Sequence, residues 1–202
     1  MKFWAALPLI SLTLSIAAGL PARAQTSASN PLGLTDSRLI SAELAYSQGR
    51  FDEAERVVRQ VIASEADPRT SAQAWAISAR AAHKKGNAPA ADQAFQRALA
   101  SPKELGPARA YVQLQYARAL YEVQRFGRAR RSAEAAVDAL SGVDLGDAYL
   151  IIAAYCLEKG MDARAAQAID RAWRRVLPER QSELRALAAR LGQGQSSQAE
   201  LE

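Results

Sequence analysis

Alanine recurs at two fixed positions along most of this chain, and the spacing restricts the possible folds more than any other feature of the sequence. Four consecutive segments, called units here, each carry one alanine in a first apolar stretch and another in the stretch that follows. These positions are Ala42, Ala79, Ala117 and Ala153, and then Ala54, Ala91, Ala129 and Ala165. Successive members of the second set are 37, 38 and 36 residues apart. A period of this length is typical of stacked units that bury a core between neighbours.

Each second stretch is predicted to be an amphipathic helix. Counted from its alanine, residues suited to a buried face stand four and seven positions further on, which places them on one side of a helix. They are Val58, Phe95, Ala133 and Ile169, followed by Val61, Ala98, Ala136 and Ala172. Between the two stretches, Gly49, Gly86 and Gly160 share one position, where a left-handed residue would end the first helix. Gln124 occupies that position in the third unit.

Alanine at the two shared positions has a physical reason. Two helices approach to about 8 Å only where the contact carries little side chain, and alanine allows this without the helix penalty of glycine. We therefore expect all eight alanines to be buried in an all-α protein. The expected helix pairs are 36–48 with 52–65, 71–85 with 88–100, 107–124 with 127–140, and 145–159 with 162–176.

These positions resemble those of the tetratricopeptide repeat (TPR) family. In the second unit the family's spaced pattern is matched by Trp75, Ala79, Gly86, Ala91, Phe95 and Ala98. The segments EAERVVRQVI and RAAQAIDRAW have the form of its second helix, and the resemblance covers about residues 35–178. It implies a right-handed α-solenoid of four helix pairs. The units of this chain are longer than the family's usual length of about 34 residues.

The ends of the array are predicted from their composition. A ninth helix at 179–191 is expected to cap the array and to cover Trp173, which gives a helical-repeat domain at 35–191. The linker 25–34 and the tail 192–202 have little to bury, so both are expected to be disordered. The apolar stripe of the capping helix consists of Leu184, Leu187 and Leu191.

The first 24 residues have the organisation of an export signal. Lys2 supplies a positive charge, residues 3–20 are uncharged and largely apolar, and Ala22-Arg23-Ala24 forms a cleavage site. A membrane anchor is the alternative interpretation, but prolines and a glycine interrupt the apolar stretch. We therefore expect residues 1–24 to be a signal peptide that is removed, leaving a soluble periplasmic protein.

The charge balance argues against some partners and permits others. Without Lys2 and Arg23 the chain has 24 basic and 21 acidic residues, a net charge near +3. Such a value does not call for nucleic acid, whereas an acidic protein partner or peripheral contact with anionic lipid is compatible with it. Two arginine clusters are either solvent-exposed and paired with Glu134 and Asp170, or they contact anionic groups. The clusters are Arg125, Arg128, Arg130 and Arg131, and Arg171, Arg174 and Arg175.

No group of residues in the sequence suggests catalysis. His83 is the only histidine and Cys156 the only cysteine, and they fall in different units, which leaves neither a nucleophile pair nor a metal cluster. We therefore expect no enzyme activity, no cofactor and no metal. Cys156 is expected to be a small buried residue, with an intermolecular disulfide or a reactive thiol as the alternative.

The TPR resemblance implies that the first helix of each pair lines a concave groove. Arg80 and Arg118 share one position in neighbouring units, so they are predicted to hold an acidic side chain or a C-terminal carboxylate of a partner. Tyrosines at another shared position would supply rigid contact area. The predicted peptide-binding residues are Glu43, Tyr46, Arg80, His83, Lys84, Leu114, Arg118 and Tyr121.

The sequence therefore predicts a non-catalytic scaffold or adaptor of the bacterial cell envelope that binds a peptide segment in its concave groove. The alternative is a regulatory or lipid-contacting subunit of an envelope enzyme, or of a secretion or pilus complex, in which the arginine clusters make the contact. The partner, the pathway and the oligomeric state are left open, and self-association through the basic convex face is one possibility.

Overall fold

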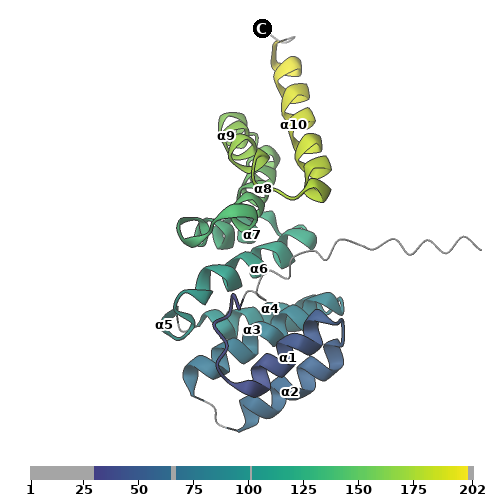
Figure 1. Ribbon diagram of the computed structural model, residues 1–202. Helices are drawn as coiled ribbons and strands as arrows, with labels where there is room; N and C mark the ends of the chain where they lie inside the picture. Colours follow the sequence, from purple (N-terminus) through teal and green to yellow (C-terminus); the bar gives the residue numbers. More distant parts are fainter. Residues whose placement is uncertain (1–29, 65–66, 101, 200–202) are drawn as a thin grey trace, which may run out of the picture.

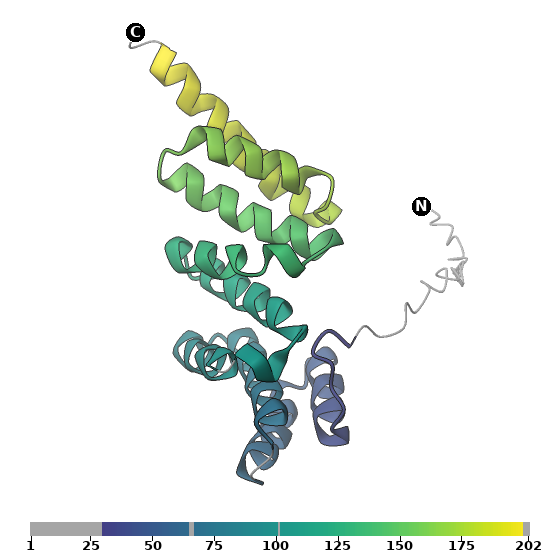
Figure 2. The same cartoon turned by 90° about the vertical axis from the view of Figure 1, so that its left-hand side faces the viewer.

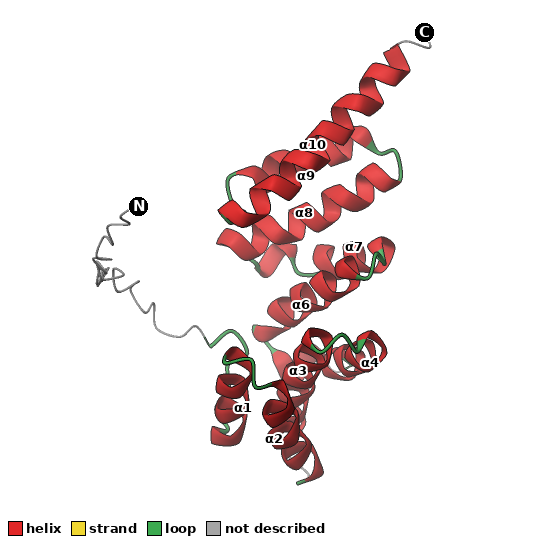
Figure 3. Cartoon of the chain, turned by 90° about the vertical axis from the view of Figure 1, so that its right-hand side faces the viewer, coloured by secondary structure: helices red, strands yellow, loops and turns green. Residues whose placement is uncertain are grey.

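The computed structural model describes residues 30–64, 67–100 and 102–199. The predicted signal peptide, 1–24, and residues 25–29 of the predicted linker lie outside these residues. Within the described part, helices are the only regular secondary structure, and short loops connect them (Figure 3). The prediction of an all-α protein is confirmed. No helix among the described residues is long and apolar enough to cross a membrane.

Eight of the helices form four consecutive pairs. These are α1 (Ser37–Ser47) with α2 (Phe51–Ala63), α3 (Pro68–Lys84) with α4 (Ala88–Leu99), α6 (Ala108–Glu122) with α7 (Phe126–Glu134), and α8 (Gly142–Glu158) with α9 (Asp162–Trp173). Each pair packs on the next, so the array runs from α1 and α2 at one end to α10 (Pro178–Ala199) at the other (Figure 1). A short helix, α5 (Pro102–Leu105), precedes α6, and a 3-10 turn, η1 (Val137–Ala139), follows α7.

Four of the paired helices, α3, α7, α8 and α9, depart from a predicted limit by three residues or more. The expected start of α3 was residue 71, but the helix begins at Pro68, because Asp67 caps it and proline suits the first helical position. The second helix of the third unit was expected at 127–140. It ends as α7 at Glu134, and η1 covers part of the remaining length.

The eight alanines at the shared positions are all buried, and none is more than 2% exposed. The prediction about them is therefore confirmed. The residues four and seven positions after the second alanine are also buried in every unit, from Val58 and Val61 in α2 to Ile169 and Ala172 in α9. Helices consequently contact one another through small side chains, and larger residues such as Phe95 and Ile77 fill the space between pairs.

The turn inside each pair has the same geometry in all four units. The residues at the shared turn position have a left-handed backbone, with φ of 76° at Gly49, 78° at Gly86, 63° at Gly160 and 57° at Gln124. The N–H group of the next residue then bonds to the carbonyl five residues earlier, at 2.8 Å in three turns and 2.9 Å in the other. This is the Schellman motif, which satisfies carbonyls at a helix end. The residue that follows is the N-cap of the second helix.

Gln124 is the single residue other than glycine with positive φ in the described part of the chain. A side chain at this backbone conformation costs free energy that glycine avoids. We therefore expect Gln124→Gly to raise the free energy of unfolding by about 0.5–1 kcal/mol, measured by urea denaturation. Gly160→Gln, at the same position of the fourth unit, is the control and should have the opposite sign. A neutral or destabilising Gln124→Gly would contradict this account.

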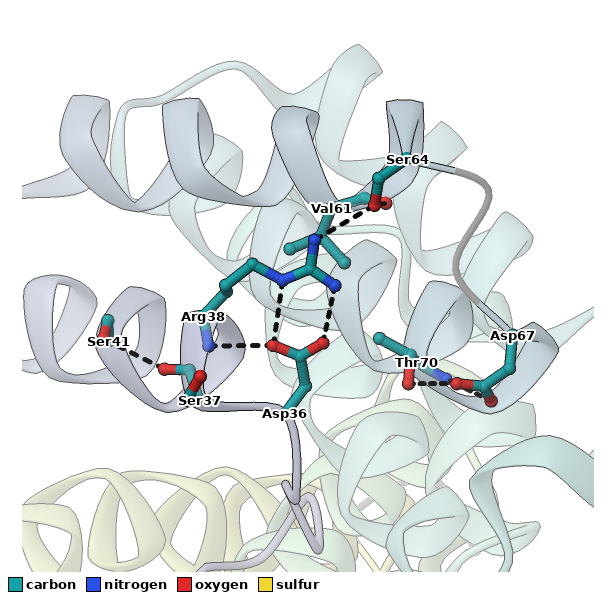
Figure 4. Close-up of polar contacts among 8 residues, drawn as sticks. All are labelled: Asp36, Ser37, Arg38, Ser41, Val61, Ser64, Asp67 and Thr70. Atoms are coloured by element: carbon teal, nitrogen blue, oxygen red, sulfur yellow. Dashed lines mark hydrogen bonds and ion pairs between the residues drawn. The ribbon is translucent and has the colours of Figure 1, made fainter.

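A network of polar contacts fixes the start of α1 against the end of α2 (Figure 4). Asp36 accepts the backbone N–H of Arg38, and the Arg38 guanidinium donates to both oxygens of the same carboxylate. Nη1 of Arg38 also donates to Oγ of Ser64, 3.1 Å away at the end of α2. The hydrogen bonds from the Arg38 side chain lower the pKa of Asp36 from 3.8 to about 2.

The depressed pKa of Asp36 predicts a specific pH dependence. Because the carboxylate is favoured in the folded state, its contribution to stability is complete above about pH 4 and is lost as the pH falls towards about 2. Asp36→Asn keeps a residue that can cap α1 but does not titrate. We expect the difference in unfolding free energy between the wild type and this variant to shrink over that range, measured by denaturation at a series of pH values. A constant difference would argue against the ion pair.

Both ends of the described array differ from the sequence prediction. Residues 30–34 were assigned to a disordered linker, which is wrong, because Leu32 and Leu34 are buried. The Gln73 side-chain amide donates to the Leu32 carbonyl at 2.8 Å and holds this segment on α3. At the other end, α10 continues to Ala199, beyond the predicted end of the capping helix at residue 191 (Figure 2).

The capping helix also differs in detail. Leu184 and Leu187 are buried as predicted, but Trp173 is 43% exposed, so α10 does not cover it. In sequence, α10 continues the pattern of the first helices, since Leu187 follows the buried Ile151 by 36 residues. α10 thus holds the place of a further first helix, and no second helix follows it among the described residues.

At the opposite end, α1 exposes two apolar side chains. Ile40 is 51% and Leu44 is 55% exposed, whereas Ile77 and Ile151, at the Ile40 position of later units, are buried. No preceding pair is present among the described residues to cover them. The outer side of the first unit therefore exposes apolar side chains of the kind that later units bury.

Candidate functional site

Glu43 on α1 and Arg80 on α3 form an ion pair between the first two units. Both carboxylate oxygens of Glu43 lie 2.8 Å from Nη1 of Arg80. The two residues are 37 apart and hold the same position in neighbouring units, so stacking of the units places them side by side. Both belong to the predicted peptide-binding set.

The Arg80 side chain is nearly enclosed, with 9% of it exposed. Its guanidinium carbon lies 4.1 Å from the ring centre of Tyr46 and 5.6 Å from that of Tyr111, within the range of cation–π attraction. Burial would lower the pKa of Arg80, but Tyr111 and Glu43 outweigh this and raise it, so the side chain is charged. Its Nε is buried and has no hydrogen-bond partner. Nε of Arg80 is therefore a donor that no described residue satisfies.

Arg118 is held in a similar way by the fourth unit. Its Nε and Nη2 donate to Oδ2 of Asp147 at 3.0 and 2.6 Å, and Nη2 also donates to Asp144 at 2.9 Å. Both acids lie on α8. Arg80 and Arg118 thus bind carboxylates of their own chain, which the sequence analysis did not expect.

Two other residues predicted to bind a peptide have contacts within the chain instead. Leu114 is fully buried and belongs to the core, so its assignment to a binding surface is wrong. The hydroxyl of Tyr121 donates to Oε1 of Glu183 on α10, and its ring packs against Phe126. Burial and the bond to Glu183 raise the pKa of Tyr121. Tyr121 therefore links the third unit to the capping helix.

The remaining predicted residues meet at one small cavity, called the central cavity here. Nε2 of His83 lies 2.8 Å from Oε2 of Glu122 on α6, while Lys84 is exposed and makes no ion pair among the described residues. The volume of the cavity is about 50 Å³. Five of the eight predicted residues line it. The full lining is Tyr46, Arg80, His83, Lys84, Phe95, Gln115, Arg118 and Glu122.

Two larger cavities adjoin the central cavity. One, of about 720 Å³, lies between α4 and α6 and shares His83 and Phe95 with it. The other, of about 440 Å³, shares Arg118 and Glu122 with it and extends to Glu183 on α10. The three cavities therefore share lining residues along the second and third units, and one of them reaches α10.

Sequence reasoning missed several residues of this site. Tyr111, Gln115 and Asp147 were not singled out, although each contacts or lines the arginine positions. One signal was available for the Glu43–Arg80 pair, since opposite charges at one position of adjacent units face each other when the units stack. No comparable signal existed for Arg118, because Asp147 occupies a different position in its unit.

The arginine clusters are partly paired within the chain. Nη1 of Arg130 lies 3.2 Å from Oε1 of Glu134, as predicted, and Arg128 bonds to Asp92 and to the hydroxyl of Tyr116. In the second cluster, the structure shows no ion pair with Asp170 among the residues it describes. The two clusters thus differ in how far their charges are compensated.

The described residues contain no group of three or more His, Cys, Asp or Glu side chains placed to hold a metal ion. Cys156 is free and buried as predicted, and burial raises the pKa of its thiol. Comparison with protein-family models and with curated proteins finds no match to this chain.

The Glu43–Arg80 pair predicts a large effect of one truncation. Glu43→Ala leaves an enclosed guanidinium without its carboxylate, so the free energy of unfolding should fall by about 3 kcal/mol. Glu53→Ala removes a similar carboxylate from an exposed pair with Arg50 and should cost less than about 1 kcal/mol. Urea denaturation of both variants measures the two values. Equal costs would show that burial of Arg80 does not determine the energy of the pair.

Proposed function

We propose that this protein is a non-catalytic scaffold or adaptor of the TPR type, which binds a peptide segment of a partner protein along its first helices. The observation that carries the proposal is the central cavity. Arg80, His83, Lys84 and Arg118 line it together with Glu122, and the enclosed Arg80 keeps an unsatisfied Nε. Glu43, Asp144 and Asp147 already pair with the two arginines, so the unpaired charge of Lys84 and the free Nε are what favour an acidic group of the partner.

The size of the central cavity supports a small anionic group. A volume of about 50 Å³ is close to that of one or two water molecules, which suits a carboxylate but not a large side chain. Lys84 at the rim has no ion pair among the described residues and is available to such a group. Either an Asp or Glu side chain or a free C-terminus would satisfy these donors.

The neighbouring cavities support a segment rather than a single group. They lie on both sides of the central cavity and share its residues, so a partner chain with its acidic group in the centre would place flanking residues in the two larger spaces. Phe126, which is partly exposed, offers aromatic surface in one of them. Rigid aromatic contacts of this kind commonly carry binding energy at interfaces.

In this proposal Arg80 and Arg118 act through their fixed positions. Each is already oriented by carboxylates of the chain, so little side-chain freedom would be lost when a partner binds. Lys84 then contributes the exposed charge that attracts the partner. The concave, right-handed arrangement of the first helices belongs to the same proposal, as does export to the periplasm by the signal at 1–24.

Substitution of Lys84 tests the proposal. Peptides are first selected from a random display library against the purified protein, and those that bind should carry an acidic residue or a free C-terminal carboxylate. For these peptides, Lys84→Glu should weaken binding at least about tenfold, a change of about 1.4 kcal/mol, in a fluorescence-anisotropy titration. Lys103→Glu changes the charge of the chain equally at an exposed position of α5 and should have little effect. Selected peptides without acidic groups, or equal effects of the two variants, would overturn the proposal.

A further inference from the structure

A second charged cavity lies between the start of α7 and the end of α8. We propose that it binds a phosphate group, through Arg125, Arg131 and Lys159. Its volume is about 540 Å³. Among the lining residues Glu158 is the only acid. The complete lining is Gln124, Arg125, Phe126, Gly127, Arg128, Arg131, Tyr155, Glu158 and Lys159, and this set is called the basic cavity below.

The same place in the first two units shows what is missing from the basic cavity. Lys85, which follows α3, has its Nζ 2.7 Å from Oδ1 of Asp52 and 2.8 Å from Oε2 of Glu55. Both acids lie in the first turns of α2, the second helix of the preceding unit. Two carboxylates thus neutralise the lysine at this junction.

Lys159 holds the position of Lys85 two units later, since it follows α8 as Lys85 follows α3. The second helix of the preceding unit is then α7, which begins at Phe126 as α2 begins at Phe51. Counted from these starts, the positions of Asp52 and Glu55 are occupied by Gly127 and Arg130. Both carboxylates are therefore absent at this junction, and one is replaced by a cation.

The cations of the basic cavity fall into two groups. Arg128 is bound to Asp92 and Tyr116, and the neighbouring Arg130 is bound to Glu134 and lies over the ring of Tyr155. Arg125, Arg131 and Lys159, by contrast, make no ion pair or side-chain hydrogen bond within the part of the chain that the structure describes. Glu158 at the rim pairs with none of them. Three positive charges are thus left without a partner around one cavity.

The chemistry of these donors fits a phosphate better than a carboxylate. A free phosphate or phosphate monoester carries more than one charge and at least three acceptor oxygens, so several cations can share it, and guanidinium groups bind it through two parallel hydrogen bonds. A lipid phosphodiester presents one negative charge and two free oxygens to the same donors. The start of α7 adds backbone N–H groups, because no side chain caps this helix. The phosphate comes either from a soluble compound or from the headgroup of an anionic lipid.

Gly127→Asp tests the proposal without damaging the fold. The variant restores the carboxylate that Asp52 supplies in the first unit, and a Cβ at Gly127 meets only the Tyr155 ring, at 3.7 Å. Gly127 has no positive φ, and an acid in the first turn of a helix is favourable. We expect this variant to melt at a higher temperature than the wild type and to lose phosphate binding. Loss of binding in a more stable protein cannot be attributed to unfolding.

The binding measurements use two probes at low ionic strength. Inorganic phosphate is titrated by calorimetry, and vesicles of phosphatidylglycerol are compared with vesicles of phosphatidylcholine by sedimentation. Arg131→Ala combined with Lys159→Ala should weaken binding at least about tenfold, whereas Lys103→Ala should not. Binding of inorganic phosphate supports a soluble ligand, and binding of phosphatidylglycerol vesicles alone supports a lipid headgroup. Failure of both probes, or binding that survives Gly127→Asp and the double variant, would overturn the proposal.

Discussion

The structure depends on close contact between helices at positions where the side chain is a single methyl group. Ala42 and Ala54 allow α1 and α2 to pack together, and the same arrangement recurs in each later unit. Because the contact distance is short, the turn between the helices is tightly constrained, and all four turns adopt one backbone geometry. Regular packing in turn places equivalent side chains of adjacent units next to one another.

This regularity explains why much of the fold could be predicted and some of the site could not. The helices and the buried alanines follow from a pattern of residues within each unit, and this pattern recurs in all four units. Leu32 and Leu34 lack such a period, so their packing against α3 was not foreseen. Likewise, the bond from Tyr121 to Glu183 depends on where α10 docks, which is a tertiary property.

The arginines show a different limit of sequence reasoning. Arg80 and Arg118 were recognised as special because they repeat, yet each was considered without its neighbours. In the structure their partners are Glu43 from the unit before and Asp147 from the unit after. A charged position in a repeat array therefore has to be judged against the adjacent units before it is assigned to a ligand. By that standard Lys84 and the unpaired cations near α7 are stronger candidates for a ligand than Arg80 and Arg118.

The exposed Ile40 and Leu44 show that the two ends of the array are not equivalent. The C-terminal end finishes in α10, whose outer side carries charged residues such as Arg185 and Arg190. The N-terminal end instead presents the kind of surface that interior units bury. Among the described residues, exposed apolar side chains of α1 therefore mark one end of the array and charged side chains of α10 mark the other. An additional hairpin, grafted ahead of Asp36, would find a contact surface already formed, so the chain offers a natural point for lengthening by insertion or by design.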